Sequence, residues 1–253
     1  MKLLFLLLLS TLAALAADKT APITPREVIP LFNGKDLTGF YTWETKHGRE
    51  DPDRVFTVVD QIDGAPAIRM SGQHHGGIVT KARYTNYRLT AEFRWGAITW
   101  EPRMNKARDS GILLHCQGED GNYMEDFKAP WMRSVEYQMI EGGTGDIILV
   151  GGYERGQTEQ IFPTLTAKVR PGTKNWDPAG VPTEFKKNRI DWQFRDPEWK
   201  DVLGFRGKKD VERPVGQWNQ IEAICDGGWK PRPSSPRSST PLAPARRRAR
   251  RAK

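Results

Sequence analysis

Short strand-like runs follow one another along most of this chain and constrain its fold more than any other feature. Gly, Pro, Asp or Asn separates one run from the next, and few segments carry a sustained helical period. The runs cover residues 56–59, 67–70, 77–80, 87–95, 111–115, 135–140, 147–150 and 218–225. Many short strands separated by turn residues are typical of an all-β sandwich or barrel, so we predict an all-β fold.

Two of these runs place polar side chains on one face of a sheet. Successive strand side chains point to opposite faces. His115 therefore shares a face with Gly111, whereas Glu136 and Gln138 share a face of residues 134–140. If the strands are neighbours, the buried set is Ile112, Leu114, Val135, Tyr137 and Met139. We then expect an imidazole, a carboxylate and an amide on the other face, as a candidate reaction or sugar-binding surface.

The clearest alternation lies in residues 89–95. It predicts a core-facing set made of Leu89, Ala91, Phe93 and Trp95. Glu92 and Arg94 would then lie on the same side as His115, provided that this strand is a neighbour of residues 111–115. Residues 151–210 are rich in proline, and we interpret them as long loops that wall a cleft.

The two ends of the chain differ from its body. Residues 1–17 have the pattern of a secretory signal peptide, with Lys2 before a short apolar run and Ala14-Leu15-Ala16 as a cleavage site. We therefore expect a secreted or periplasmic protein with no integral membrane segment after cleavage. Export would allow Cys116 and Cys225 to pair, although two buried thiols are an equal alternative.

The basic charge is confined to the C-terminal end. The formal net charge is +8, yet residues 229–253 hold nine Lys or Arg and no acid. Without these and Lys2, 29 basic residues face 31 acidic ones, a net charge of −2, so the body lacks the basic footprint of a nucleic-acid binder. We predict one domain over residues 27–228 and a disordered basic tail over 229–253.

The tail begins where a strand is expected. Residues 221–225 alternate like a strand, and Asp226-Gly227-Gly228 is typical of a hairpin turn, but Pro, Ser, Ala and Arg follow in place of a returning strand. A genuine basic tail is one interpretation. We favour a reading-frame shift in GC-rich DNA, which would have removed the last strands. Alternating apolar residues should then appear in another frame.

Four motifs resemble the 3-keto-disaccharide hydrolase domain family. Residues 30–40 (PLFNGKDLTGF) are similar to its opening signature, 109–115 (DSGILLH) and 134–141 (SVEYQMIE) to two of its central strands, and 213–222 (RPVGQWNQIE) to a later segment. The resemblance covers about residues 28–228, and the chain departs from it after Gly228. It implies a concanavalin-like jelly roll of two curved antiparallel sheets, and activity on glycosides whose sugar carries a ketone at carbon 3.

That ketone acidifies the hydrogen at carbon 2, so cleavage by elimination needs a base, an oxyanion stabiliser and a proton donor. Glu136 or His115 can act as the base, Arg133 or a divalent metal ion as the stabiliser, and Glu141 as the donor. The candidate substrate-binding residues are Gln138, Glu92, Arg94, Asp109 and Trp131.

Alternatives remain open at this stage. Glu136 and Glu141 have the spacing of the two acids in some retaining glucanases of the same fold, although Gln138 replaces the intervening Asp of that motif. A non-catalytic carbohydrate-binding module is a third hypothesis. Each candidate also has a purely structural interpretation. His115 can be a hydrogen-bond partner, Glu136 and Gln138 can lie on a solvated sheet face, and Arg133 can pair with Glu136 or Glu141. For His74-His75 a metal or sugar role competes with a solvated loop.

Overall fold

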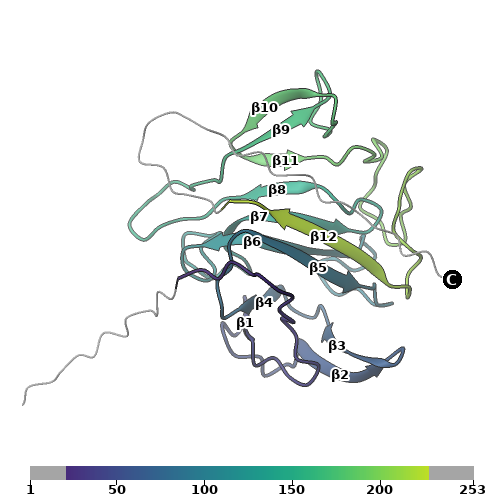
Figure 1. The fold of residues 1–253 in the computed structure, drawn as a ribbon. Coiled ribbons are helices and arrows are strands. Elements are labelled where there is room, and N and C mark those ends of the chain that lie inside the picture. Colours follow the sequence, from purple (N-terminus) through teal and green to yellow (C-terminus); the bar gives the residue numbers. More distant parts are fainter. Residues whose placement is uncertain (1–20, 228–253) are drawn as a thin grey trace, which may run out of the picture.

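The computed structural model describes residues 21–227, and every regular element in that range is a strand (Figure 1). The prediction of an all-β fold is therefore confirmed. The predicted signal peptide and the basic tail lie outside the described residues. Within residues 21–227, no helix has the length and apolar character that a membrane crossing requires.

A four-stranded antiparallel sheet forms the centre of the fold. Its strand order is β11-β8-β7-β6, and the bounds are β6 Asp109–Gln117, β7 Arg133–Ile140, β8 Ile147–Val150 and β11 Asn188–Ile190. Both predicted polar-faced runs, 111–115 and 134–140, are neighbours in this sheet. In their register Gly111 lies opposite Gln138, and Leu113 lies opposite Glu136.

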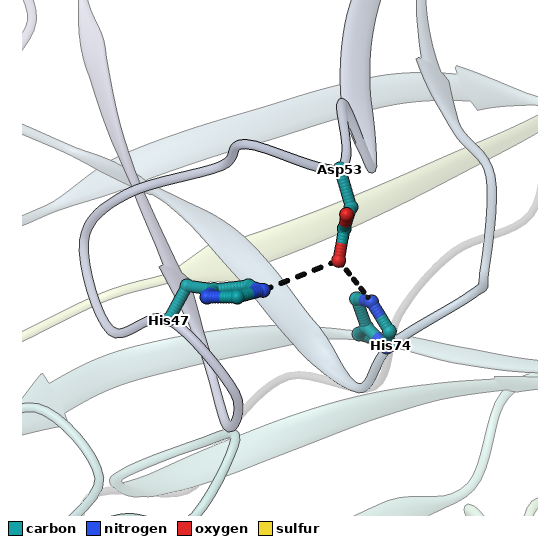
Figure 2. Close-up of side chains that lie close together, drawn as sticks. All are labelled: His47, Asp53 and His74. Carbon is teal, nitrogen blue, oxygen red and sulfur yellow. Dashed lines mark hydrogen bonds and ion pairs between the residues drawn. The ribbon is translucent and has the colours of Figure 1, made fainter.

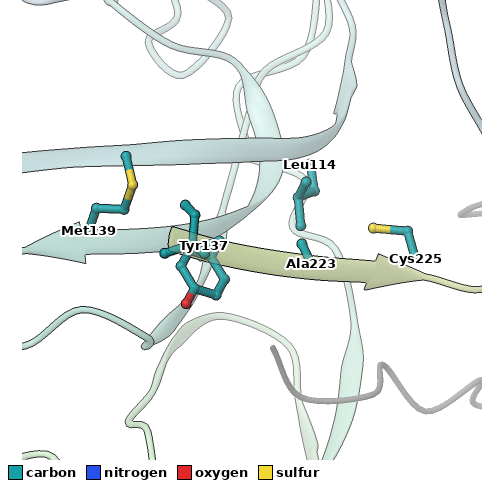
Figure 3. Packing of buried hydrophobic residues seen from close by; sticks show 6 residues of the cluster. Leu114, Tyr137, Met139, Ala223 and Cys225 are labelled. Carbon is teal, nitrogen blue, oxygen red and sulfur yellow. The ribbon is translucent and has the colours of Figure 1, made fainter. Parts of the chain in front are cut away.

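A second layer covers one face of this sheet. It consists of β5 (Tyr87–Phe93) paired antiparallel with β12 (Asn219–Cys225), and Figure 1 shows the pair lying across β6 and β7. Leu89, Ala91, Phe93 and Trp95 pack against the core cluster between the layers, as the alternation predicts. The cluster itself is Leu114, Tyr137, Met139, Ile221, Ala223 and Cys225 (Figure 3). The two layers thus form a β-sandwich.

The cysteines do not pair. Cys225 is buried in the core cluster, Cys116 is exposed, and both are free thiols. The structure therefore shows neither a disulfide nor two buried thiols, because Cys116 is exposed.

Three strand pairs flank the sandwich. They are β1 (Phe40–Glu44) with β4 (Gly76–Thr80), β2 (Phe56–Ile62) with β3 (Ala65–Met70), and β9 (Leu165–Val169) with β10 (Val181–Phe185). Leu165 and Val169 of β9 join a second buried cluster with Val135, Leu149 and Ile190. The prediction of loops throughout 151–210 is therefore wrong in part, because β9, β10 and β11 are short strands, and Pro182 lies within β10 opposite Lys168.

Candidate active site

Strands β6 and β7 bring a carboxylate and an amide together on the face of the sheet that points away from the core. Glu136 and Gln138 lie on this face, because Val135, Tyr137 and Met139 between and around them are buried in the core clusters. The Gln138 amide donates a hydrogen bond of 2.8 Å to the Asp109 carboxylate on β6. Two of the three side chains predicted for this face, Glu136 and Gln138, therefore lie on it together with Asp109.

Gly111 makes room for the Glu136 side chain. A Cβ added at Gly111 would lie 2.2 Å from the Oε1 atom of Glu136, closer than real atoms approach. The carboxyl group thus leans across the neighbouring strand over a residue without a side chain. A glycine inside a strand often marks such a close approach, so the Ser-Gly-Ile run in the sequence carries a signal for this contact.

Burial governs the electrostatics of Glu136. The pKa of its carboxyl group is raised to about 7, chiefly by removal from water and also by the nearby Asp109 carboxylate, while Arg189 acts to lower it. Among the described residues, no hydrogen-bond or ion-pair partner holds this carboxyl group. A half-buried carboxyl that titrates near neutrality without a partner can accept a proton from a bound molecule.

Two arginines supply positive charge near this face. Arg189 on β11 and Glu136 on β7 both lie opposite Ile148 of β8, so they share one row across the sheet. Arg103 contacts Asp109 at 3.5 Å and Asp201 at 2.7 Å. Neither arginine is predicted from the sequence, because Arg189 reaches this face through strand register and Arg103 lies outside the strands, where alternation sets no direction.

Glu141 does not belong to this site. It is 0% exposed, and its carboxylate accepts a 2.7 Å hydrogen bond from the Arg108 guanidinium and a 3.1 Å bond from the Gly204 backbone N–H. The predicted role of Glu141 as proton donor therefore lacks an accessible carboxyl group. The side chain instead fixes two loops to the end of β7, which ends at Ile140.

His115 does not keep the strand alternation. The register of β6 shifts between Leu114 and Gln117, and His115 adopts a φ of 55°. Its ring lies 6.0 Å from the ring of Tyr87, and burial lowers its pKa. No hydrogen bond or ion pair in the described part of the chain joins His115 to Glu136, so the bulge separates the two predicted bases.

Arg133 also lies apart from Glu136. Its guanidinium donates 3.3 Å hydrogen bonds to the Gln117 side chain and to the Glu154 carboxylate. The predicted ion-pair partners were Glu136 and Glu141, and the structure replaces them with Glu154. An oxyanion role beside Glu136 is thus not supported for this side chain.

The remaining predicted residues lie elsewhere. β5 pairs with β12, so Glu92 and Arg94 lie on the outer face of the second layer, where they contact Gln220 and Asp63 respectively. The condition on which their grouping with His115 depended is therefore not met. Trp131 is 37% exposed and lies against two other rings, those of His75 and Tyr123.

Residues with the donor atoms for a metal ion also lie apart from this face. Within residues 21–227, the one group of His, Cys, Asp or Glu side chains with suitable spacing is His47, Asp53 and His74. None of these is on the strands that carry Glu136, Gln138 or Asp109.

The comparisons with known proteins identify a family. Residues 27–229 match the family model described as the 3-keto-alpha-glucoside-1,2-lyase-like domain, which confirms the resemblance drawn from the four motifs. Neither the curated proteins nor the solved structures contain a match to the chain.

Proposed function

Because the chain belongs to this carbohydrate-active family, we propose that it cleaves 3-keto-glycosides by elimination, with Glu136 as the general base. The observation that carries the proposal is the Glu136 carboxyl itself. It is half-buried on a polar sheet face, has a pKa of about 7, and has no partner among the described side chains. The ideal pKa of a general base lies near the working pH.

The proposed reaction uses the acidity of the hydrogen at carbon 2. Glu136 takes this proton, and the electron pair of the C2–H bond moves toward the ketone to give an enolate. The bond between carbon 1 and the glycosidic oxygen then breaks, the leaving oxygen takes a proton from water, and a double bond forms between carbons 1 and 2. Addition of water across this bond gives the free 3-keto sugar, and Glu136 returns its proton to solvent.

The neighbours of Glu136 match the charges of this reaction. Arg189 lowers the pKa of Glu136, and Arg103 pairs with Asp109 beside it, so these two guanidinium groups are the cations proposed to stabilise a negative enolate. Gln138 is buried beside the acid, and its amide donates to the Asp109 carboxylate, so it orients that carboxylate and does not meet a sugar directly. Export, predicted from residues 1–17, completes the proposal by placing the enzyme where it meets extracellular glycosides.

The test compares a 3-keto-disaccharide with its parent disaccharide. We expect cleavage of the keto sugar alone, and a loss of about 10²–10⁴-fold in kcat/KM for Glu136→Gln, the usual contribution of a general base. In D₂O the product should gain deuterium at carbon 2 during turnover. Glu92→Gln, an exposed acid on the opposite layer, is the matched control. Cleavage of the parent sugar alone, or full activity in Glu136→Gln, would reject the proposal.

A non-catalytic carbohydrate-binding role is the second candidate, and the exposed aromatic group around Trp131 favours it. The Trp131 ring lies 5.9 Å from Tyr123 and 6.0 Å from His75, a surface suited to stacking on a sugar ring. Binding of glycosides that depends on Trp131, without turnover of any of them, would support this role. Retaining hydrolysis is not proposed, because Arg108 holds the second acid that it requires, Glu141.

A further inference from the structure

At the side of the molecule that carries β1 to β4, two histidine side chains from different loops contact one carboxylate oxygen of an aspartate from a third loop. His47 follows β1, Asp53 precedes β2, and His74 lies between β3 and β4. The Nε2 atoms of His47 and His74 lie 3.2 Å and 2.8 Å from Oδ2 of Asp53, and Figure 2 shows both rings directed at this atom. The three potential ligand atoms lie within 4.8 Å of one another.

We propose that His47, Asp53 and His74 bind a divalent transition-metal ion of the Zn²⁺ type. Two imidazole nitrogens and one carboxylate oxygen form a donor set that suits Zn²⁺, Co²⁺ or Ni²⁺. Mg²⁺ and Ca²⁺ prefer sites built from oxygen alone. The site is independent of Glu136 and of the proposed sugar chemistry.

Only a small movement of the three side chains would bring their ligand atoms to the spacing that a zinc ion requires. Ligands of a tetrahedral zinc ion at bond lengths of about 2.0–2.1 Å lie about 3.3 Å apart. Both nitrogen-to-oxygen distances are already close to this value, so the remaining adjustment concerns the two imidazoles. The side chains of His47 and His74 are 28% and 25% exposed. They therefore have room to move, and solvent can supply the remaining ligand.

Lys46 contacts the same oxygen atom of Asp53. Its ammonium group lies 2.9 Å from Oδ2 of Asp53, on a side chain that is 55% exposed. Lys46 therefore stands beside the oxygen atom that a metal ion would take as its ligand. A metal ion and Lys46 compete for one ligand atom.

A bound ion would join the end of β1 to the segments that precede β2 and follow β3. It would also fix the loop that carries His75, whose ring lies against Trp131. The predicted effect is therefore a stabilising link between the β1–β4 pair and the β2–β3 pair. Binding to the folded state alone raises the free energy of unfolding with ion concentration.

The experiment is calorimetric titration of the full-length, untagged chain with ZnCl₂ after removal of metal by EDTA. We expect one Zn²⁺ per chain, and a dissociation constant at least tenfold larger in His74→Ala and in Asp53→Asn than in the wild type. His75→Ala, which changes the neighbouring histidine outside the triad, should bind as the wild type does. Circular dichroism of each variant separates loss of the site from loss of the fold.

Lys46→Met distinguishes a metal site from a simple ion-pair cluster. Removing the competing ammonium should tighten Zn²⁺ binding by roughly two- to fivefold, the worth of one exposed ion pair. Weaker binding in Lys46→Met would overturn the proposal, as would absence of Zn²⁺ binding by the wild type, or unchanged binding in a folded Asp53→Asn variant. Ca²⁺ or Mg²⁺ bound as tightly as Zn²⁺ would contradict the donor assignment.

Discussion

Replacing Glu136 by Gln should stabilise the protein at alkaline pH while removing its activity. The carboxyl group has a pKa of about 7 in the folded protein and 4.5 as the ordinary value, with burial as the main cause of the difference. Each tenfold change in proton affinity corresponds to about 1.4 kcal/mol. The ionised Glu136 therefore destabilises the folded state by about 3 kcal/mol at most.

The sign follows from the order in which the two states lose the proton. Below pH 4.5 the carboxyl group is protonated in both states, and the wild type loses no stability through it. Between pH 4.5 and about 7 the unfolded chain ionises first, so the free energy of unfolding falls as the pH rises. Above that range both states are ionised and the loss is complete.

The assay is urea unfolding of the wild type and Glu136→Gln at several pH values. The free energy of unfolding of the variant should equal that of the wild type at about pH 4, and exceed it by about 3 kcal/mol at about pH 8. Glu92→Gln controls for the loss of one negative charge at an exposed position. A difference that does not change with pH, or a variant less stable than the wild type at about pH 8, would refute the assignment of a raised pKa to Glu136.

Three further predictions follow from contacts in the same region. Gly111→Ala should lower kcat/KM by roughly 10²-fold, because the new Cβ, 2.2 Å from Oε1, displaces the Glu136 carboxyl; steady-state kinetics with unchanged far-UV circular dichroism would show this. Glu141→Gln should cost about 3–5 kcal/mol in urea unfolding, because Arg108 loses its buried anion, and an unchanged midpoint would contradict that pairing. Glu44→Met should raise stability by about 1–3 kcal/mol in the same assay, because both carboxylate oxygens of Glu44 are buried without a partner among the described groups; a destabilised variant would contradict this.

The sequence predicts what depends on local alternation. The two-residue period places Glu136 and Gln138 on one face, and the same period places Leu89 and Phe93 in the core. These assignments need no information about distant residues, because direction along a strand is set by the pleat. Gly111 is visible in the sequence as a glycine inside a strand, but its contact with Glu136 follows from the register of β6 and β7.

The sequence does not predict what depends on register or on the point where a strand ends. The bulge at His115 shifts the alternation of β6. The φ of His115 is positive, a conformation that favours glycine, but no glycine stands there to mark the bulge in the sequence. Glu141 lies one residue beyond β7, where the period no longer sets direction, and its partner Arg108 is far away in the sequence. Arg189 reaches the row of Glu136 only through the pairing of β8 with two neighbours.

Comparison of the acids around the sheet supports the proposal that Glu136 is the general base. Asp146 is fully buried but accepts 2.8 Å hydrogen bonds from Arg189 and Arg195, and Glu141 is held by Arg108. Glu44 lacks such a partner but is 0% exposed, so no ligand can reach it. Glu136 combines partial exposure with the absence of a cationic partner in contact. Keeping an acid in this state lowers stability, and such groups persist mainly where chemistry requires them.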